Sequence, residues 1–431
     1  MKILIYIFLA LVVATSCVPL PNSGGNTTYY SNKELKLEDY SYEKNIQTVQ
    51  LYPFSGNVND VFAPPSVHIN QQKQLLLEFD EIGNQTKQYY VKLIHCNQDW
   101  TKSILSDIQF CNDFNESLIT NFIMATGTVT SYVHYKFAVP KVKLSGNYVV
   151  MVYRDGNADD VIITKRFIVY EERMPINTLL NMSTLADKRR SNHQLDFTVS
   201  YGGNVTMPQD IKAIIKQNNR WDNCKSLNPL YINPQDNLLD YRYFGGENNF
   251  DAGNEFRSFD IRSIISAGVN VKNIVREYGR ADVYLMRDQS RNFPAYNQQP
   301  DINGSFVIGR KETGDGVTDG EYAQVHFEFK AKEPIEGQLF VIGSFNNWQT
   351  EKRYELKLDS ASSTYKLVLP FKQGYYNYIY TLKQNNKFDE IKYEGSYYET
   401  EDMYEIIMYY RAPGTIADAI VGYQVMRSYN R

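Results

Sequence analysis

The sequence has few of the residue patterns from which catalytic and metal sites are built. Only 4 cysteines and 5 histidines occur in 431 residues, and none shows the Cys-x-x-Cys or Cys/His spacing of a zinc site. No serine lies in a G-x-S-x-G elbow. Adjacent carboxylates such as Asp159 and Asp160 point to opposite faces of a strand. We therefore predict no catalytic, metal or cofactor-binding residues and a protein that is not an enzyme.

Clusters of positive charge are also absent. Lysine and arginine number 45 against 49 aspartate and glutamate, which gives a net charge of −4 without a basic tract. Nucleic-acid binding needs a clustered positive surface, so we exclude it. No stretch has the periodicity of a long amphipathic helix, and the apolar run at residues 3–13 is too short to cross a bilayer.

The N-terminus instead has the pattern of an export signal. Met1 and Lys2 precede the apolar run, and small residues then lead to Cys17, so residues 1–17 are predicted to be a signal peptide. The end of this segment resembles the lipobox of bacterial lipoproteins, which implies acylation of Cys17; the alternative is ordinary cleavage nearby. Residues 18–40 fit a flexible tether. Several acyl chains on one residue would anchor the protein stably to a membrane.

Aromatic residues, by contrast, are abundant: they make up 14% of the chain, and 35 of them are tyrosines. Tyrosine suits half-buried positions in sheets, where the ring packs and the hydroxyl stays hydrated. Residues 75–100 show the pattern most clearly, because apolar and polar residues alternate on both sides of a turn at Gly83 and Asn84. This alternation predicts two strands that form a hairpin.

The same alternation recurs along most of the chain and predicts an all-β protein of tandem immunoglobulin-like (early-set type) β-sandwich domains. Met174-Pro175 and the charged, glycine-rich segment 311–321 break the pattern. We therefore predict an N-terminal sandwich at 41–173, a middle β-rich domain at 174–312 and a C-terminal sandwich at 313–431. A strand at 404–411 is expected to complete the third sandwich.

Two long polar segments interrupt the strands, at residues 100–120 and 220–256. Segments of that length are either packed elaborations or binding loops, and both are candidate docking loops because recognition residues often lie on loops. Cys111 lies in the first of them. In an exported chain Cys96 and Cys111 can form a disulfide; the alternative is that they and Cys224 are buried, reduced thiols.

The C-terminal region contains one candidate ligand-binding residue. The sequence GQLFVIGSFNNWQ at 337–349, followed by an alternating aromatic strand, resembles the glycogen-binding type of carbohydrate module. That resemblance implies that Trp348 stacks on a sugar ring. The alternative, which we favour, is that Phe345 and Trp348 fill the core of the sandwich.

A second resemblance covers nearly the whole chain, from about residue 45 to the C-terminus. It is carried by segments whose order and approximate spacing match throughout: NIQTVQLYP (45–53), LLLEFDEI (75–82), YYVKLIHCNQDWTKSIL (89–105), YVHYKFAVP (132–140), LSGNYVVMVYRD (144–155), IKQNNRWDN (215–223), GNEFRSFDIRS (253–263), DINGSFVI (301–308) and EGSYYETEDMYEIIMYYR (394–411). In these segments the chain resembles the plug protein family of the type IX secretion system.

The resemblance implies a non-enzymatic protein in the periplasm that associates with the outer membrane. Its expected partner is the large outer-membrane β-barrel translocon of type IX secretion, whose pore it would seal from the periplasmic side. A lipid anchor at Cys17 would hold it at the membrane, and no small-molecule substrate or cofactor is expected. The alternative function is an outer-membrane glycan-binding lipoprotein that uses the C-terminal sandwich.

Overall fold

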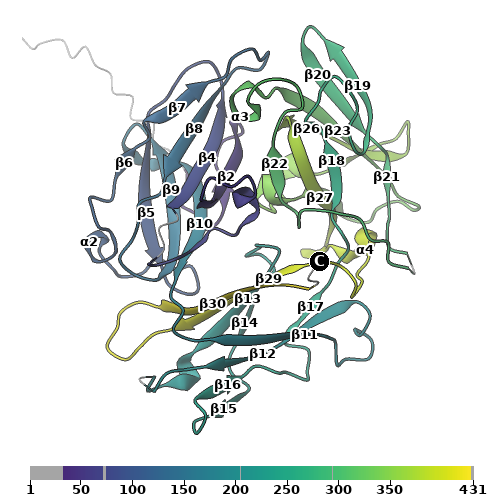
Figure 1. Cartoon of the computed structure of the whole chain (residues 1–431). Coiled ribbons are helices and arrows are strands. Elements are labelled where there is room, and N and C mark those ends of the chain that lie inside the picture. The colour runs from purple at the N-terminus through teal and green to yellow at the C-terminus, as the bar shows by residue number, and fades with distance from the viewer. Residues whose placement is uncertain (1–32, 71–73, 204, 294, 429–431) are drawn as a thin grey trace, which may run out of the picture. The chain divides into compact units, whose positions relative to one another are not determined.

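Twisted, mostly antiparallel sheets packed face to face make up the fold in a computed structural model, which describes residues 33–70, 74–203, 205–293 and 295–428 (Figure 1). The described residues from Lys33 onward form a single unit. The predicted all-β sandwich architecture is confirmed, while its immunoglobulin-like subtype stays a prediction.

Two sheets form the first sandwich. One has the order β1 (Tyr40–Ser41), β10 (Asn157–Tyr170), β9 (Gly146–Arg154), β5 (Tyr89–Cys96) and β6 (Ser117–Leu118), with β3 (Ser66–His68) beside β10. The other has the order β2 (Ile46–Phe54), β4 (Gln74–Ile82), β8 (Tyr132–Ala138) and β7 (Asn121–Met124). A short helix α2 (Asp107–Phe110) and a 3₁₀ turn (Asp60–Phe62) lie in the connections.

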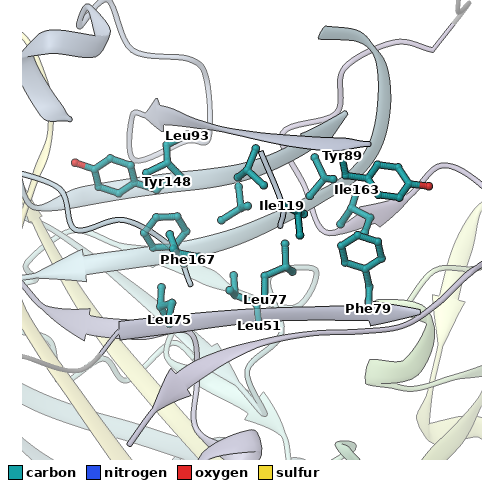
Figure 2. Packing of buried hydrophobic residues seen from close by; sticks show 14 of the residues in the cluster. Leu51, Leu75, Leu77, Phe79, Tyr89, Leu93, Ile119, Tyr148, Ile163 and Phe167 are labelled. Atoms are coloured by element: carbon teal, nitrogen blue, oxygen red, sulfur yellow. The ribbon is translucent and has the colours of Figure 1, made fainter. Parts of the chain in front are cut away.

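The core of this sandwich lies between its two sheets. Figure 2 shows Leu77 and Phe79 of β4 facing Tyr89 of β5, and the rings of Phe79 and Tyr89 lie 5.6 Å apart. The predicted hairpin at 75–100 is therefore wrong, because β4 pairs with β2 and β8 while β5 pairs with β9 and β6. The strands are correctly placed, but their connection crosses from one sheet to the other.

The middle sandwich combines strands that lie far apart in the sequence. One sheet has the order β11 (Ile176–Met182), β12 (Asn192–Ser200), β16 (Leu238–Asp240) and β15 (Tyr231–Asn233), with β17 (Asn249–Asp251) beside β12. The other has the order β14 (Lys225–Leu227), β13 (Lys212–Gln217), β29 (Met403–Tyr410) and β30 (Ala419–Arg427). A 3₁₀ turn at Pro208–Asp210 precedes β13.

The strand predicted at 404–411 thus does not complete the third sandwich. It is β29, which pairs with β13 so that Ile407 lies opposite Ile214. Ile406 and Met408 enter the middle core beside Leu195 and Phe197. In Figure 1 the yellow β29 and β30 accordingly lie beside the teal β13. Alternation correctly predicted a strand but contained no information about its partner.

The C-terminal sandwich is built around β27 (Gly374–Gln384), which pairs with β18 (Arg257–Asp260), β22 (Phe306–Ile308), β24 (Gln338–Ile342) and β28 (Lys387–Asp389). The facing sheet has the order β19 (Val271–Glu277), β20 (Arg280–Leu285), β23 (Tyr322–Lys330), β26 (Thr364–Lys372) and β25 (Lys357–Asp359), with β21 (Asp288–Gln289) beside β23. Short helices α3 (Gly316–Asp319) and α4 (Ile391–Glu394) and 3₁₀ turns at Ser344–Asn346 and Lys352–Tyr354 lie in the connections. The pairs β18–β27 and β20–β23 join strands from both sides of the boundary predicted at 312.

The first and middle sandwiches meet through an apolar junction. Val149 and Ile168 of the first sandwich share one buried cluster with Ile407 and Ile420 of the middle one. At its edge Trp100 meets Trp221 in an edge-to-face contact with the ring centroids 4.7 Å apart. Burial of this apolar surface is a non-directional, charge-independent source of stability. We call this cluster the apolar junction.

The first and C-terminal sandwiches meet instead through buried charge. Asp80 of β4 accepts hydrogen bonds from Lys372 Nζ and from the Tyr322 hydroxyl, both at 2.7 Å, and its other oxygen lies 2.7 Å from His134 Nδ1. Asp80 and Lys372 have side chains that are 0% and 1% exposed. Because a buried charge is tolerated only when it is paired, these side chains hold the two sandwiches in one register. We call this network the ionic junction.

Candidate functional site

A cleft of about 1000 Å³ lies between the middle and C-terminal sandwiches. Its walls bring together two features that the sequence singled out separately. One wall comes from residues 217–225 and 246–256, and the other includes Trp348 and residues 387–391. The cleft is therefore the first place to look for a binding function.

The segment 220–256 is largely a packed elaboration rather than a free loop. It contains the short strands β14 to β17, which pair with β12, β13 and with each other. Its bends use residues with positive φ, such as Asn237 (51°) and Gly253 (62°), because asparagine and glycine tolerate that conformation best. Of the two alternatives predicted for this segment, packing accounts for most of it, and its inner edge lines the cleft.

Arg220 links the two walls of the cleft. Its guanidinium donates hydrogen bonds to both carboxylate oxygens of Glu390, at 2.7 and 2.6 Å, and to Asp222. The side chain is only 4% exposed. Burial opposes the charge, but the two carboxylates outweigh burial and raise the pKa of Arg220 above its ordinary value. Bidentate pairing of this kind fixes geometry as well as charge.

The same guanidinium covers Trp348, the residue predicted to stack on a sugar. The Arg220 carbon lies 4.2 Å from the ring centroid, and Phe256 approaches in an edge-to-face contact at 5.7 Å. Gly304, at φ +76°, allows the ring to approach closely, since a Cβ there would lie 2.3 Å from it. Trp348 and Phe345 both pack against core clusters. A sugar could reach only the opposite face of the ring unless Arg220 moves.

The carboxylates that line the cleft are held by partners within the protein. Glu394 accepts hydrogen bonds from Arg257 and Arg291, and Asp402 accepts one from Asn218 at 2.6 Å. Within the described ranges no group of three or more potential metal-ligating side chains occurs. The chemistry of this cleft is therefore that of paired ions and amides, with the buried Asn249 Oδ1 and Thr381 Oγ1 lacking hydrogen-bond partners among the residues described.

The second candidate loop, 100–120, has a buried half and an exposed half. Trp100 and Phe110 are buried, and Arg166 stacks on Trp100 at 4.4 Å. Ile104, Ile108 and Phe114 are 78%, 79% and 85% exposed. Exposed apolar side chains that gather on one surface can mark a site that binds another macromolecule. We refer to these three residues as the apolar loop.

The cysteines of the described chain are free thiols. Cys96 packs in the apolar junction and Cys111 in the core of the first sandwich, so the two side chains lie in different clusters. Burial raises the pKa of Cys96 to about 12 and that of Cys111 to about 11. Cys96 and Cys111 are thus buried, reduced thiols in this structure, whereas Cys224 is exposed rather than buried.

Cys17 and the predicted signal peptide lie outside the described residues. Among the residues that are described, no helix has both the length and the apolar character required to span a bilayer.

Sequence reasoning missed the ionic junction and the role of Arg220. A signal for the first was present, because Glu78 and Asp80 place two charges among the apolar residues of the predicted strand LLLEFDEI (75–82). Lys372, the partner of Asp80, lies 292 residues further along the chain, and no periodicity connects the two. Arg220 lies in a polar segment, and nothing in the sequence pairs it with Glu390 or Trp348.

Comparison with known proteins gives two informative matches. Residues 46–171 match the family model described as the first domain of the type 9 secretion system plug protein. A crystal structure of a hypothetical protein from Parabacteroides merdae is 29% identical, covers 91% of this chain and 100% of its own, and has a TM-score of 0.85. The three-sandwich architecture therefore recurs in that protein as a whole.

The other comparisons contribute nothing to the functional argument. Trypsin-activated alpha-2-macroglobulin from Escherichia coli is 8% identical, with 88% of this chain and 24% of that chain covered and a TM-score of only 0.16. No protein in the curated set matches the sequence.

Proposed function

Since this chain belongs to the type IX secretion system plug family through its first domain, we propose that it closes the pore of that system's outer-membrane translocon. The family gives it a role in type IX secretion and a location in the envelope, associated with the outer membrane. In our proposal the chain docks at the periplasmic mouth of the barrel and leaves when cargo is transported. The family match over residues 46–171 is the observation that carries this proposal.

The two junctions support a plug because a seal must resist deformation. The first sandwich is fixed to the middle one by the apolar junction and to the C-terminal one by the ionic junction. Inter-domain motion is the default where such interfaces are small and polar, and here both contain fully buried side chains. A unit of this kind can close an opening without a change in the arrangement of its sandwiches.

We assign the docking surface to the apolar loop. It lies within the part of the chain that matches the plug family, and its three large side chains are almost fully exposed. Exposed aromatic and aliphatic side chains commonly become the buried centre of an interface. The glycan-binding alternative has less support, because Arg220 already covers one face of Trp348.

Affinity purification tests the proposal. The tagged chain, extracted in mild detergent, should co-purify with a very large outer-membrane barrel. The double variant Ile108→Glu, Phe114→Glu should recover at least about tenfold less of it, since interface anchors commonly contribute 2 kcal/mol or more. Val58→Glu is the matched control, because Val58 is 84% exposed on another loop of the same sandwich. Recovery of the chain alone would contradict the proposal.

Anchoring is a separate proposal with its own test. We propose that Cys17 is acylated and tethers the chain beside the barrel, which raises its local concentration there. A metabolic fatty-acid label should be incorporated into the chain and lost in Cys17→Ala. Labelling that persists in Cys17→Ala would show that the anchor is elsewhere, and an unlabelled parent chain would show that there is none.

A further inference from the structure

A small aromatic pocket of about 250 Å³ opens where the first sandwich meets the C-terminal one, apart from the cleft described above. Its floor consists of rings from the C-terminal core: Phe306, Phe345, Phe371 and Tyr376. These rings contact one another, with Phe371 lying 4.9 Å from Phe345 and 4.8 Å from Tyr376. A cavity of roughly 150 Å³ lined by apolar side chains is already large enough to bind benzene. The pocket can therefore hold an apolar ring.

An irregularity in β2 builds the facing wall. The pairing of β2 with β4 shifts register between Gln47 and Gln50, and Thr48 has a φ of +49°. β-branched residues rarely adopt that conformation, and such outliers cluster where a ligand or partner is held. Thr48 Oγ1 lies 3.3 Å from the hydroxyl of Tyr322, which also lines the pocket. The bulge thus places polar groups of the first sandwich over an aromatic floor of the other.

The charged residues that line the pocket are all cations: Lys44, Arg353 and Lys372. Lys372 is neutralised by Asp80 in the ionic junction. Arg353 directs Nε toward Glu351 at 2.8 Å. Lys44 is exposed, and no described residue forms an ion pair with it. An apolar floor under a cationic rim complements a ring that carries a negative charge.

We propose that this pocket binds an aromatic or branched apolar group that carries a carboxylate. The ring lies against Phe345 and Phe371, and the carboxylate faces Lys44. The carboxyl-terminal residue of a polypeptide and a free aromatic acid share this chemistry. Because Lys372 lines the pocket and also pairs with Asp80, an occupant lies beside the contact that joins the two sandwiches. The inference is independent of the secretion role.

Calorimetric titration of the purified chain tests the proposal with defined probes. Acetyl-Gly-Gly-Phe with a free carboxylate should bind, and the same peptide with an amidated terminus should bind roughly fivefold more weakly, as expected for an exposed charge pair. Acetyl-phenylalanine distinguishes the two sources. If the tripeptide binds with the same affinity as acetyl-phenylalanine, the pocket accommodates a chain terminus. If acetyl-phenylalanine binds and the tripeptide does not, the site is one for a free acid.

Two surface variants keep the test specific. Val368→Glu introduces a carboxylate at an exposed position of the pocket wall and should weaken binding of the acid at least about tenfold by adding repulsion to lost apolar contact. Leu358→Glu is the matched control, since Leu358 is exposed on the neighbouring strand β25 and does not line the pocket.

Lys44→Gln tests the contribution of the positive charge separately from that of the apolar contacts. It should weaken binding of the acid roughly fivefold and leave binding of the amide unchanged. The proposal is overturned if no probe binds, if acid and amide bind equally well to the parent chain, or if Leu358→Glu weakens binding as much as Val368→Glu does.

Discussion

The two junctions of the first sandwich differ in chemistry although both are buried. The apolar junction joins it to the middle sandwich through aliphatic and aromatic side chains, whereas the ionic junction joins it to the C-terminal sandwich through Asp80, His134 and Lys372. Apolar burial holds surfaces together under most conditions. A buried ion pair contributes little net stability, but it strongly penalises any state that leaves one charge unpaired. The second junction therefore specifies register and is expected to respond to pH, whereas the first is held mainly by apolar burial.

Removal of one charge should break the ionic junction most severely. Lys372→Met leaves Asp80 buried without its cation, and we expect a loss of about 3–5 kcal/mol in the free energy of unfolding. The double variant Asp80→Leu, Lys372→Met should recover most of that loss, because neither member of the pair is left buried without the other. Urea unfolding measures both. A double variant as unstable as the single one would mean that the pair itself, and not the orphaned charge, provides the stability.

Truncation in the apolar junction should have a somewhat smaller effect. Ile407→Ala removes a fully buried side chain and should cost about 2–4 kcal/mol through lost burial and the cavity left behind. Because no titratable group of the ionic junction is involved, the loss should be the same at pH 5 and at pH 8. A loss that changes with pH would show that the two junctions are coupled.

The pH dependence of the ionic junction follows from His134. Burial disfavours its protonation, but the hydrogen bond to Asp80 and the nearby Glu78 outweigh burial and raise its pKa above the ordinary 6.5. A raised pKa contributes stability that is complete below pH 6.5 and lost as pH rises through the folded-state pKa. We expect the free energy of unfolding to decline over this range, as measured by urea midpoints. His134→Gln should abolish the decline; if the decline persists in that variant, His134 is not its source.

The contribution of Glu78 to stability depends on pH in the opposite direction. Burial would raise the pKa of Glu78, but His134 and Lys136 lower it to about 2. This contribution is present above the ordinary value of 4.5 and lost as pH falls toward 2. The ionic junction should thus be most stable between about pH 4.5 and 6.5.

The smallest expected effect is on thiol reactivity, which tests whether the two junctions open together. Cys96 lies in the apolar junction, and burial holds its pKa near 12, so it should react with a thiol reagent only when that junction opens. Cys224 is exposed and should react faster than Cys96, although partial burial of its thiol raises its pKa. We expect Cys96 to stay protected at pH 8.5, where the ionic junction is weakened, with Cys111→Ser used to isolate its signal. Rapid labelling of Cys96 would mean that the apolar junction opens with the ionic one.

Local patterns predicted the strands but not their partners. Apolar and polar residues alternate along 323–331 as in a strand, and these residues form β23, whose Val325 and Phe327 enter the core. An equally clear pattern at 404–411 was assigned to the wrong sandwich, because β29 pairs with β13, which lies about 190 residues earlier. The predicted hairpin between β4 and β5 was wrong for the same reason. Side-chain periodicity reports which face is buried, and pairing depends on contacts distant in sequence.

The same limit applies to the candidate sites. The sequence identified Trp348 and the segment 220–256, and the structure brings both to one cleft. The sequence contained no sign that Arg220 covers one face of the Trp348 ring. The apolar loop lay within a predicted docking segment, but which of its side chains are buried and which are exposed depends on packing across the sandwich.

Site-specific photocrosslinking in the native envelope tests the central claim most directly. A photoreactive residue at position 108, in the apolar loop, should crosslink to the large type IX barrel, and one at position 58 should not. Equal crosslinking from both positions, or none from position 108 while the tagged chain still co-purifies with the barrel, would contradict the docking surface. Absence of any barrel adduct together with failure to co-purify would contradict the plug function itself.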